Sequence, residues 1–450
     1  VSLALANGDF DFAKKLAMKL IKQEFQPATP TFLNAGRARA GEMVSCFLLS
    51  IEDSTEGISY AISSASHLSK IGGGVALNLT RLRASGEAIK DIEGASGGVI
   101  GVAKMLEQSF SYFNQMGARQ GAGAAYLNVF HPDFELLLDT KKINADEKIR
   151  LTTLSIGALI PNKLMELAEK NEMAYAFYPH SIYKKYGVHL DEIKMDEWYD
   201  KLANDNDIRK KEINPRQLLT RIAQTQQESG YPYVVYIDTA NREHVLKDIG
   251  NIKMSNLCCE IFQYQTPSDI KGYAGANEWG QDISCNLGSL NIANVMDNKD
   301  MEGTIDTAIR ALTFVSDKTN INEVPTVKNG NSNSHAVGLG AMNLHGYLMR
   351  EGIMYTSEET KEFVDVFFAA MRYYCIKASM NIALEKKKTF KGFEKSEYAK
   401  GKDSSVLRKY YEIDYLPKSD KVKSLFEGMN IPTKEDWANL LDAVKTNGIY

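Results

Sequence analysis

Hydrophobic positions along the chain follow two spacings, one typical of strands and one typical of amphipathic helices. Short apolar runs bounded by glycine, proline or serine predict strands at 45–51, 72–84, 151–160, 173–179 and 231–240. Apolar residues that recur every three or four positions predict helices at 1–25, 54–71, 97–116, 161–171 and 214–230. Strands that alternate with helices indicate an α/β fold with many parallel strands.

Other stretches lack a clear period. Residues 27–37 contain two prolines and are predicted to form a loop, as is the glycine-rich 272–280, while 256–265 is predicted to be extended. Helices are expected to dominate from 303 to 390, interrupted by a polar, glycine-marked break at 329–348. The sequence after 390 is charged and less patterned, and no pronounced linker divides the chain.

Composition narrows the class of protein. Of the 450 residues, 44% are hydrophobic and 24% charged, which is ordinary for a globular protein, and the net charge of -4 gives no reason to expect a nucleic-acid or membrane partner. No run of 18 apolar residues predicts a membrane span, and the first 20 residues lack the order of a signal peptide. Five cysteines without a CxxC pair, and seven scattered histidines, predict neither a disulfide scaffold nor a metal site. We therefore expect a reducing, cytoplasmic compartment.

The stretch "SNLCCE" places two cysteines between an amide and an acid. If the chain is extended here, Asn256, Cys258 and Glu260 share one face, and Cys259 joins the apolar residues on the other. This pattern predicts that Cys258 is the reactive residue and that Cys259 fills the core. The alternative is that both cysteines are small buried hydrophobic residues.

The neighbouring acid bears on the kind of chemistry. A carboxylate facing the same cavity raises a thiol pKa, which disfavours the thiolate and is compatible with transfer of a hydrogen atom from a neutral S–H group. Cys46 and Cys285 each lie next to a serine at the end of a strand-like stretch. They can meet across a cavity and cycle between dithiol and disulfide, or they can be two unrelated buried cysteines.

Five segments together resemble a known family. "PATPTFLNAG", "EMVSCFLL", "GGGVALNLTRLR", "SNLCCEI" and "ISCNLGSLNIA" are similar, in order and spacing, to the large catalytic subunit of class I ribonucleotide reductases. The segments "GGGVALNLT", "LDTKKINADEKIR" and "VGLGAMNLHGYL" are most similar to the class Ib type. The resemblance covers essentially the whole chain.

This resemblance implies a ten-stranded α/β barrel of two five-stranded halves, of the ribonucleotide reductase and glycyl-radical type, with a central finger loop. Residues 1–26 would be an N-terminal helical remnant and 27–450 the barrel domain. The implied reaction is the radical reduction of ribonucleoside diphosphates to 2′-deoxyribonucleoside diphosphates, with allosteric control of specificity.

Roles for individual residues follow from the same resemblance. Cys258 matches the cysteine that becomes a thiyl radical and removes the 3′ hydrogen, Glu260 the general base for the 3′ hydroxyl, and Asn256 the amide that binds substrate. Cys46 and Cys285 match the pair that delivers reducing equivalents at C2′ and ends as a disulfide. The matched substrate contacts are Thr29, Ser45 and Gly74. The matched effector contacts are Asp53, Arg83 and the loop Ala84–Gly94, with Arg119 and Gln120 in the loop that relays the effector's identity.

Two of these assignments have simpler alternatives. Taken alone, "GARQGAG" is typical of an ordinary flexible loop. Asp53 and Arg83, taken alone, are typical of a solvated pair of surface charges. For partners, the resemblance implies a small subunit whose dimetal centre, of manganese or iron, generates a tyrosyl radical. It also implies the effectors dTTP, dGTP, dATP and ATP, a thioredoxin or glutaredoxin-like reductant, and a homodimer, with no metal or cofactor bound by this chain.

The sequence departs from the family at both ends. The family's serine-containing phosphate loop, paired tyrosines and C-terminal cysteine pair are not found, and the region before "PATPTF" is short. We expect an incomplete barrel that needs a complementing C-terminal fragment for turnover. The competing interpretations are an inactive nucleotide-binding or assembly module, a glycyl-radical enzyme, and a simple thiol–disulfide oxidoreductase.

Overall fold

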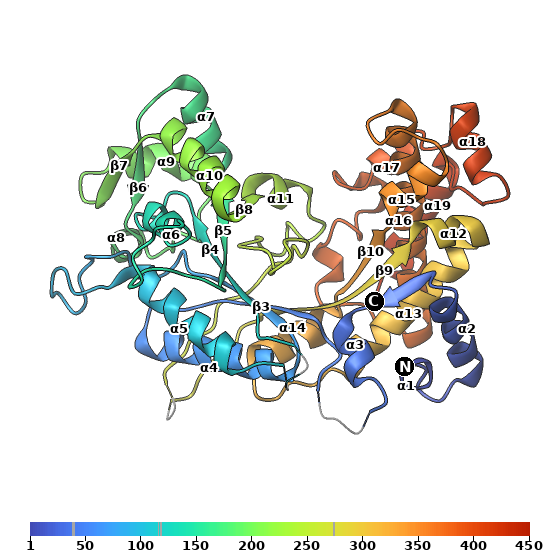
Figure 1. Ribbon diagram of the computed structural model, residues 1–450, viewed down its shortest axis with the longest axis horizontal. Coiled ribbons are helices and arrows are strands. Elements are labelled where there is room, and N and C mark those ends of the chain that lie inside the picture. The colour runs from blue at the N-terminus through green and yellow to red at the C-terminus, as the bar shows by residue number, and fades with distance from the viewer. Residues whose placement is uncertain (38–40, 116, 118, 273–274) are drawn as a thin grey trace.

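The computed structural model describes residues 1–37, 41–115, 117, 119–272 and 275–450 (Figure 1). The strands are β1 Phe25–Pro27, β2 Cys46–Leu49, β3 Gly74–Asn78, β4 Gly123–Asn128, β5 Ser155–Ile160, β6 Ala174–Phe177, β7 Lys210–Ile213, β8 Tyr233–Tyr236, β9 Ile283–Asn291 and β10 Val337–Met342. The longer helices are α2 Phe10–Ile21, α4 Thr55–Ile71, α5 Gly98–Tyr112, α7 Asn162–Lys170, α8 Pro179–Tyr186, α9 Met195–Asn204, α10 Pro215–Ser229, α13 Met301–Lys318, α14 Pro325–Ser334, α16 Glu358–Lys386 and α19 Lys434–Asn447. The shorter helices are α1 Ser2–Leu5, α3 Thr29–Asn34, α6 Phe134–Asp139, α11 Ile237–Glu243, α12 Ile292–Asn298, α15 Leu344–Arg350, α17 Lys409–Glu412 and α18 Asp420–Phe426, with 3-10 turns at Phe393–Lys395 and Gly401–Asp403.

The main sheet contains two groups of strands that run in opposite directions. Strands β2, β3, β4, β5 and β8 are adjacent and parallel, and the connections between them carry helices. Strand β9 is antiparallel to β2, and β10 is parallel to β9. In Figure 1 the strands follow a curved path between a lobe with α7, α9 and α10 and a lobe with α13, α16 and α19. The sheet is therefore a curled, open portion of a barrel.

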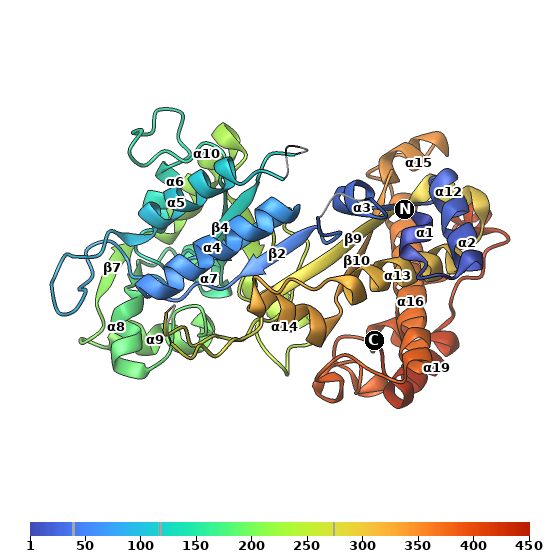
Figure 2. The same cartoon turned by 90° about the horizontal axis from the view of Figure 1, so that it is seen from below.

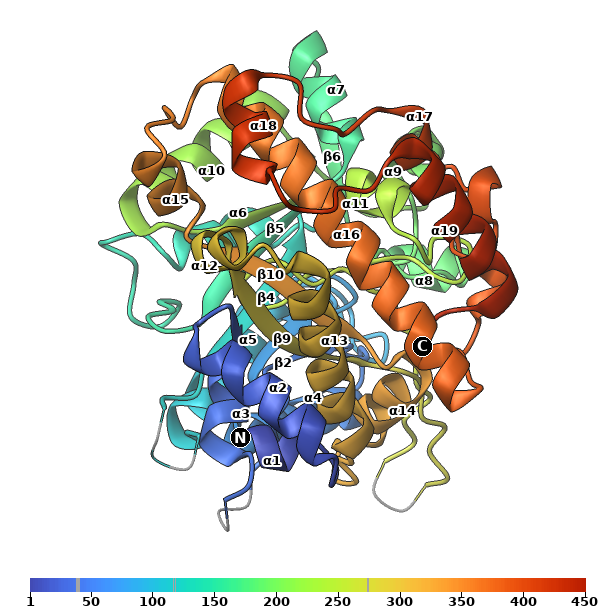
Figure 3. The same cartoon turned by 90° about the vertical axis from the view of Figure 1, so that its right-hand side faces the viewer.

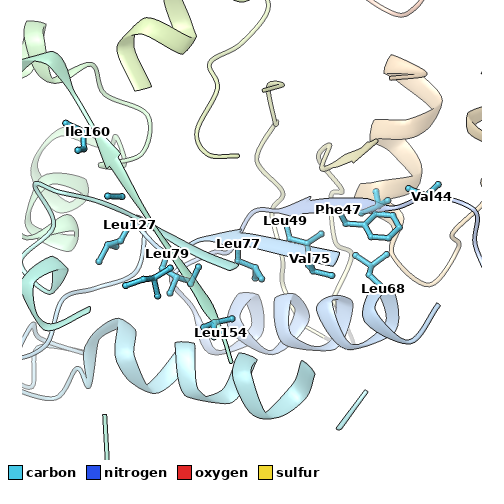
Figure 4. Packing of buried hydrophobic residues seen from close by; sticks show 14 of the residues in the cluster. Val44, Phe47, Leu49, Leu68, Val75, Leu77, Leu79, Leu127, Leu154 and Ile160 are labelled. Atoms are coloured by element: carbon cyan, nitrogen blue, oxygen red, sulfur yellow. The ribbon is translucent and has the colours of Figure 1, made fainter. Parts of the chain in front are cut away.

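Strands β2, β4 and β5 are buried on both faces, as is β3 except at Gly74, whereas β8 is only partly covered. Helices α4 and α5 cover one face (Figure 2), where Phe47 and Leu49 of β2 pack into the large hydrophobic core with Leu68 of α4 (Figure 4). Because side chains alternate along a strand, Cys46 and Leu48 lie on the opposite face, here called the inner face. Cys46 of β2 therefore points away from the helical layer.

Helices dominate the second lobe. Figure 3 shows α13 and α16 side by side, with the N-terminal α2 against α13. The buried Lys19 fixes α2 there, since its ammonium contacts Glu24 at 2.7 Å and Thr304 of α13 at 2.8 Å. No helix in the described residues is both long and apolar enough to cross a membrane.

The predicted strands are present, but several regions differ from prediction. The helix predicted over 1–25 is divided into α1 and α2. The predicted loop at 27–37 contains α3, whose Pro30 suits the first helical turn. The predicted break at 329–348 contains β10, which was missed because Gly338 and Gly340 interrupt the apolar pattern of that strand. The charged region after 390 includes α19, which begins at a capping box formed by Thr433 and Asp436. In the predicted loop at 272–280, residues 273–274 lie outside the described part.

Candidate active site

Two cysteines lie opposite each other on neighbouring strands of the sheet. Cys46 opens β2 and is paired in register with Cys285 of the antiparallel strand β9. Both side chains are buried and both thiols are free. Opposed residues of an antiparallel pair have Cα atoms about 4.5–5.5 Å apart, within the range that a disulfide spans. The two predicted redox partners are thus placed where they can form and break one bond.

Residues 255–261 form a tight turn and not the extended segment predicted from sequence. The Asn256 side-chain oxygen accepts hydrogen bonds from the backbone N–H groups of Glu260 (2.9 Å) and Ile261 (3.0 Å). The Cys259 N–H donates to the Asn256 backbone oxygen at 3.2 Å, and Cys259 has a φ of 69°. The argument from alternating faces was therefore wrong, because a capping amide and a left-handed residue fold the chain back on itself.

The turn still gives the adjacent cysteines different surroundings. Cys258 and Glu260 are exposed, whereas Cys259 is half-buried against the hydrophobic cluster of the inner face. Cys259 also lines a cavity of about 580 Å³ together with Phe262. The Cys258 side chain is thus accessible to a ligand. Cys259 is only partly buried in the core, whereas the sequence predicted that it would fill the core.

Asn256 anchors the turn to the sheet. Its backbone oxygen accepts a hydrogen bond from the Tyr126 hydroxyl at 2.6 Å, and its Nδ2 donates to the Cys46 Sγ at 3.5 Å. The Tyr126 ring lies over Gly157, where an added Cβ would come within 2.3 Å of the ring. The glycine makes room for the tyrosine, and Asn256 joins the turn to the cysteine pair.

Burial favours the neutral form of three thiols here, those of Cys46, Cys258 and Cys285. Burial raises the pKa of Cys46 to about 12 and also raises the pKa of Cys285, and the Glu260 carboxylate acts in the same direction on both. Burial and then Glu260 raise the pKa of Cys258, while Arg119 opposes them. The direction agrees with the effect expected of a neighbouring carboxylate, although burial is the larger cause. Because the thiolate is the nucleophile, such thiols are better suited to giving up hydrogen from S–H than to nucleophilic attack.

Two of the three predicted substrate contacts border the cysteine pair. The Ser45 hydroxyl donates to the Cys285 backbone oxygen at 3.3 Å. Gly74 is the register partner of Cys46 on β3, and an added Cβ there would lie 3.2 Å from the Leu257 side chain. A side chain at 74 would thus crowd the turn. Thr29 is exposed at the start of α3, next to a backbone bond from residue 28 to β9.

Two of the predicted effector residues, Asp53 and Arg83, line a separate cavity. The Arg83 side chain donates to Asp53 at 2.7 Å, and both line a cavity of about 270 Å³ with His180 and Tyr183 of α8. In the loop 84–94, the buried Glu87 accepts hydrogen bonds from the backbone N–H groups of residues 84 (2.7 Å) and 180 (3.2 Å). Asp53 and Arg83 are therefore part of a defined cavity and not an isolated surface pair. No sequence pattern predicted that α8 would contribute to its lining.

The relay loop is only partly described. Arg119 and Gln120 are exposed, and the backbone oxygen of Arg119 accepts a hydrogen bond from the Gln115 N–H at 2.9 Å. Residues 116 and 118 lie outside the described part. The influence of Arg119 on the Cys258 pKa indicates that this loop faces the turn.

The side chains that could ligate a metal ion do not cluster in the described part of the chain. Within the described ranges, no group of three or more His, Cys, Asp or Glu side chains is arranged to hold a metal ion.

Two family models match the sequence. Residues 44–450 match the model described as "Ribonucleotide reductase, barrel domain", and residues 1–40 match "Ribonucleotide reductase, all-alpha domain". The chain belongs to the ribonucleotide reductase large-subunit family. The match confirms the predicted family and the predicted α/β barrel fold.

Several curated relatives are similar over the whole chain. The "Ribonucleoside-diphosphate reductase subunit alpha" of Bacillus subtilis is 51% identical over 450 residues, which are 100% of this chain and 64% of the relative. The protein of the same name from Mycoplasma pneumoniae is 46% identical over 99% of this chain and 62% of its own length. The protein of the same name from Synechocystis is 30% identical over 97% of this chain and 54% of its own length. The chain thus spans less than two thirds of the length of these ribonucleotide reductase subunits.

Tyr126 and Gly157, which hold the turn at 255–261 against the sheet, were not predicted from the sequence. The signal for Tyr126 was present, since alternation along β4 places it with Ala124 on the inner face that also carries Cys46. Its hydrogen bond to the turn depends on residues 130 positions away and had no local signal.

Proposed function

We propose that this chain carries the reaction centre of a class Ib ribonucleoside-diphosphate reductase alpha subunit and reduces ribonucleoside diphosphates to 2′-deoxyribonucleoside diphosphates. The observation that carries the proposal is the pairing of Cys46 with Cys285, joined through Asn256 to the turn that presents Cys258. The names of the relatives support the same reaction.

The proposed reaction uses the five residues in distinct roles. Cys258, as a thiyl radical, takes the 3′ hydrogen and becomes a thiol, while Glu260 accepts the proton of the 3′ hydroxyl and Asn256 binds the substrate. Cys46 and Cys285 supply two electrons and two hydrogens. One hydrogen leaves with the 2′ hydroxyl as water, the other forms the new C2′–H bond, and the two sulfurs join as a disulfide. Cys258 then returns hydrogen to C3′ and becomes a thiyl radical again, and Glu260 returns its proton to the 3′ oxygen.

The surroundings of the thiols support these roles. The raised pKa of Cys46 keeps its hydrogen on sulfur, as a hydrogen donor requires. The exposure of Cys258 leaves it open to substrate, and the turn that carries it supports the finger-loop assignment.

Effector control and partners complete the proposal. Asp53, Arg83 and the loop 84–94 would bind dTTP, dGTP, dATP or ATP, and Arg119 and Gln120 would pass the effector's identity to the substrate base. Thr29, Ser45 and Gly74 would contact the substrate. The radical would come from a small subunit with a dimanganese or di-iron centre, and thioredoxin or a glutaredoxin-like protein would restore the dithiol in a cytoplasmic homodimer.

A single-turnover assay tests the proposal. The chain is mixed with CDP, dTTP and a class Ib small subunit, with and without the parts of the Bacillus subtilis relative that lie outside the matched region. Without a reductant we expect one dCDP for each Cys46–Cys285 disulfide found by peptide mapping, and continued turnover once dithiothreitol is added.

Adjacent cysteines provide matched variants for this assay. Cys258→Ser should abolish dCDP formation and leave dTTP binding intact, whereas Cys259→Ser should retain the reaction at lower thermal stability. Reduction that survives Cys258→Ser but not Cys259→Ser would show that the radical role belongs to the other cysteine.

A nucleotide-binding or assembly module is the second candidate. The observation in its favour is the 270 Å³ cavity at Asp53 and Arg83, which residues of this chain form without the cysteines. Binding of dTTP together with no dCDP in any of the mixtures above would favour this candidate.

A further inference from the structure

A buried arginine joins the wall of the 270 Å³ cavity to a segment behind it. Arg81 and Glu52 both line that cavity, although only 4% of the Arg81 side chain is exposed. The Arg81 guanidinium donates to Glu52 at 2.7 Å and to Asp191 at 3.1 Å, and it also donates to Glu192 at 2.8 Å. Asp191 and Glu192 lie in the connection between α8 and α9. One cation therefore ties this connection to the cavity.

The same two carboxylates also hold a lysine. The Lys253 ammonium lies 3.3 Å from Asp191 and 3.4 Å from Glu192. Burial acts to raise the pKa of Asp191, but Lys253 and Arg81 outweigh it, so the pKa is lowered and the carboxylate stays charged. The two carboxylates are thus shared between two cations. We call these four residues, Arg81, Asp191, Glu192 and Lys253, the ionic bridge.

The lysine end of the ionic bridge lies at the entry to the turn at 255–261. The Lys253 backbone oxygen accepts a hydrogen bond from the Asn78 side chain of β3 at 2.8 Å. The next residue, Met254, is buried in the hydrophobic cluster of the inner face. Because Lys253 stands only two residues before the turn, the hold on its side chain bears directly on the segment that presents Cys258.

An anion in the cavity competes for Arg81. Arg81 gives four hydrogen bonds of 2.7–3.3 Å to carboxylates. Phosphate oxygens accept from a guanidinium in the same two-point geometry. A hydrogen bond that Arg81 gives to a phosphate is lost to Asp191 and Glu192, whose charge then acts more fully on Lys253. The lysine is held more firmly as a result, and with it the entry to the turn.

We propose that the ionic bridge couples the 270 Å³ cavity to the turn, so that a triphosphate in the cavity restrains Cys258. In this arrangement Lys253 is a positioning residue, because it acts on Cys258 through the turn. The inference rests on the proposed effector function and deepens it, since it adds a route separate from the loop that carries Arg119 and Gln120.

The alkylation rate of Cys258 measures the state of the turn. The wild-type chain, Lys253→Met and Glu192→Gln are treated with iodoacetamide, with and without saturating dTTP, and the Cys258 peptide is followed by mass spectrometry. We expect dTTP to slow the wild-type reaction roughly fivefold or more, and to slow either variant by less than roughly twofold. Amide exchange at Glu260 and Ile261 should slow with dTTP in the wild type only, because their hydrogen bonds to the Asn256 side chain close the turn.

Two further variants separate coupling from a general loss of stability. Lys170→Met is the matched control, since Lys170 is an exposed α7 lysine paired with Glu166 at 2.6 Å, and it should keep the full effect of dTTP. Lys253→Arg should restore most of the effect, because a guanidinium can bind both carboxylates. Glu192→Gln guards against misfolding of Lys253→Met, since the Glu192 side chain is 32% exposed and its replacement leaves Asp191 between the two cations.

Calorimetric titration with dTTP distinguishes two kinds of failure. If the wild-type chain binds no dTTP, the effector assignment is wrong and the coupling falls with it. If dTTP binds but leaves Cys258 alkylation unchanged, the coupling alone is overturned. It is likewise overturned if dTTP slows alkylation in full in both Lys253→Met and Glu192→Gln, because the influence then passes through the loop of Arg119 and Gln120.

Discussion

The neutral state of the Cys46 thiol leads to a quantitative prediction about its reactivity. Its pKa rises from an ordinary 9.0 to about 12, chiefly through burial. Near neutral pH this shift lowers the thiolate fraction about a thousandfold. A thiolate of higher pKa is more nucleophilic, with a Brønsted slope of about 0.4–0.5, which restores roughly 15- to 30-fold. Alkylation of Cys46 should therefore be roughly 30- to 60-fold slower than that of an ordinary thiol, before any effect of restricted access.

The pH dependence distinguishes a raised pKa from simple shielding. The Cys46 peptide is followed by mass spectrometry after timed treatment with iodoacetamide between about pH 7 and about pH 9.5. The folded chain should show a logarithm of rate that rises about one unit per pH unit throughout, whereas the urea-unfolded chain should level off near the ordinary thiol pKa of 9.0. Glu260→Gln should speed the folded reaction, because Glu260 raises the Cys46 pKa. A folded rate that levels off near pH 9 would refute the assignment of a neutral, buried hydrogen donor.

Three further predictions concern the effector cavity and the anchor of the turn. Arg83→Met should weaken dTTP binding roughly tenfold or more in calorimetric titration, because it removes a cation from the cavity. Burial raises the pKa of Glu87 to about 7 from 4.5, so its contribution to stability is complete below about pH 4.5 and is lost as the pH rises through about 7. The free energy of unfolding should fall by up to about 3 kcal/mol across that interval, and Glu87→Gln should remove this slope; equal slopes in the two proteins would contradict the assignment. Gly157→Ala should cost about 1–3 kcal/mol of stability by pushing on Tyr126, while Gly97→Ala, with no atom within 4 Å of its added Cβ, should cost little; equal melting temperatures would argue against the anchor.

Some parts of the candidate site could be predicted from the sequence, and others could not. Strand β2 was predictable, because a short apolar run between two serines is a local pattern that favours a strand. The turn at 255–261 was not, since it depends on one side-chain oxygen bonding to backbone groups four and five residues ahead. Residue types and motifs identified Cys258 and Glu260 as candidates. Their local geometry, however, was predicted for the wrong backbone conformation.

Contacts between distant segments were beyond sequence reasoning for a different reason. The register of β2 on β9 brings Cys46 against Cys285, and nothing near either cysteine specifies that register. The cavity at Asp53 and Arg83 likewise gains His180 through the packing of α8, not through any local motif. Local patterns predicted the elements, whereas pairings of high sequence separation required the assembled sheet.

The distance along the chain between β2 and β9, the strands that carry Cys46 and Cys285, has a consequence for how the protein is made. The hydrogen bond from Ser45 to Cys285 joins residues 240 positions apart. A ribosome that adds about 5–20 residues per second needs roughly 12–48 s to cover that stretch. During this time β2 can pair with β3 but not with β9, and such long-range pairings are slow to form. A partly synthesised chain therefore carries Cys46 without Cys285 opposite it, and the two thiols come together only after residue 285 has left the ribosome.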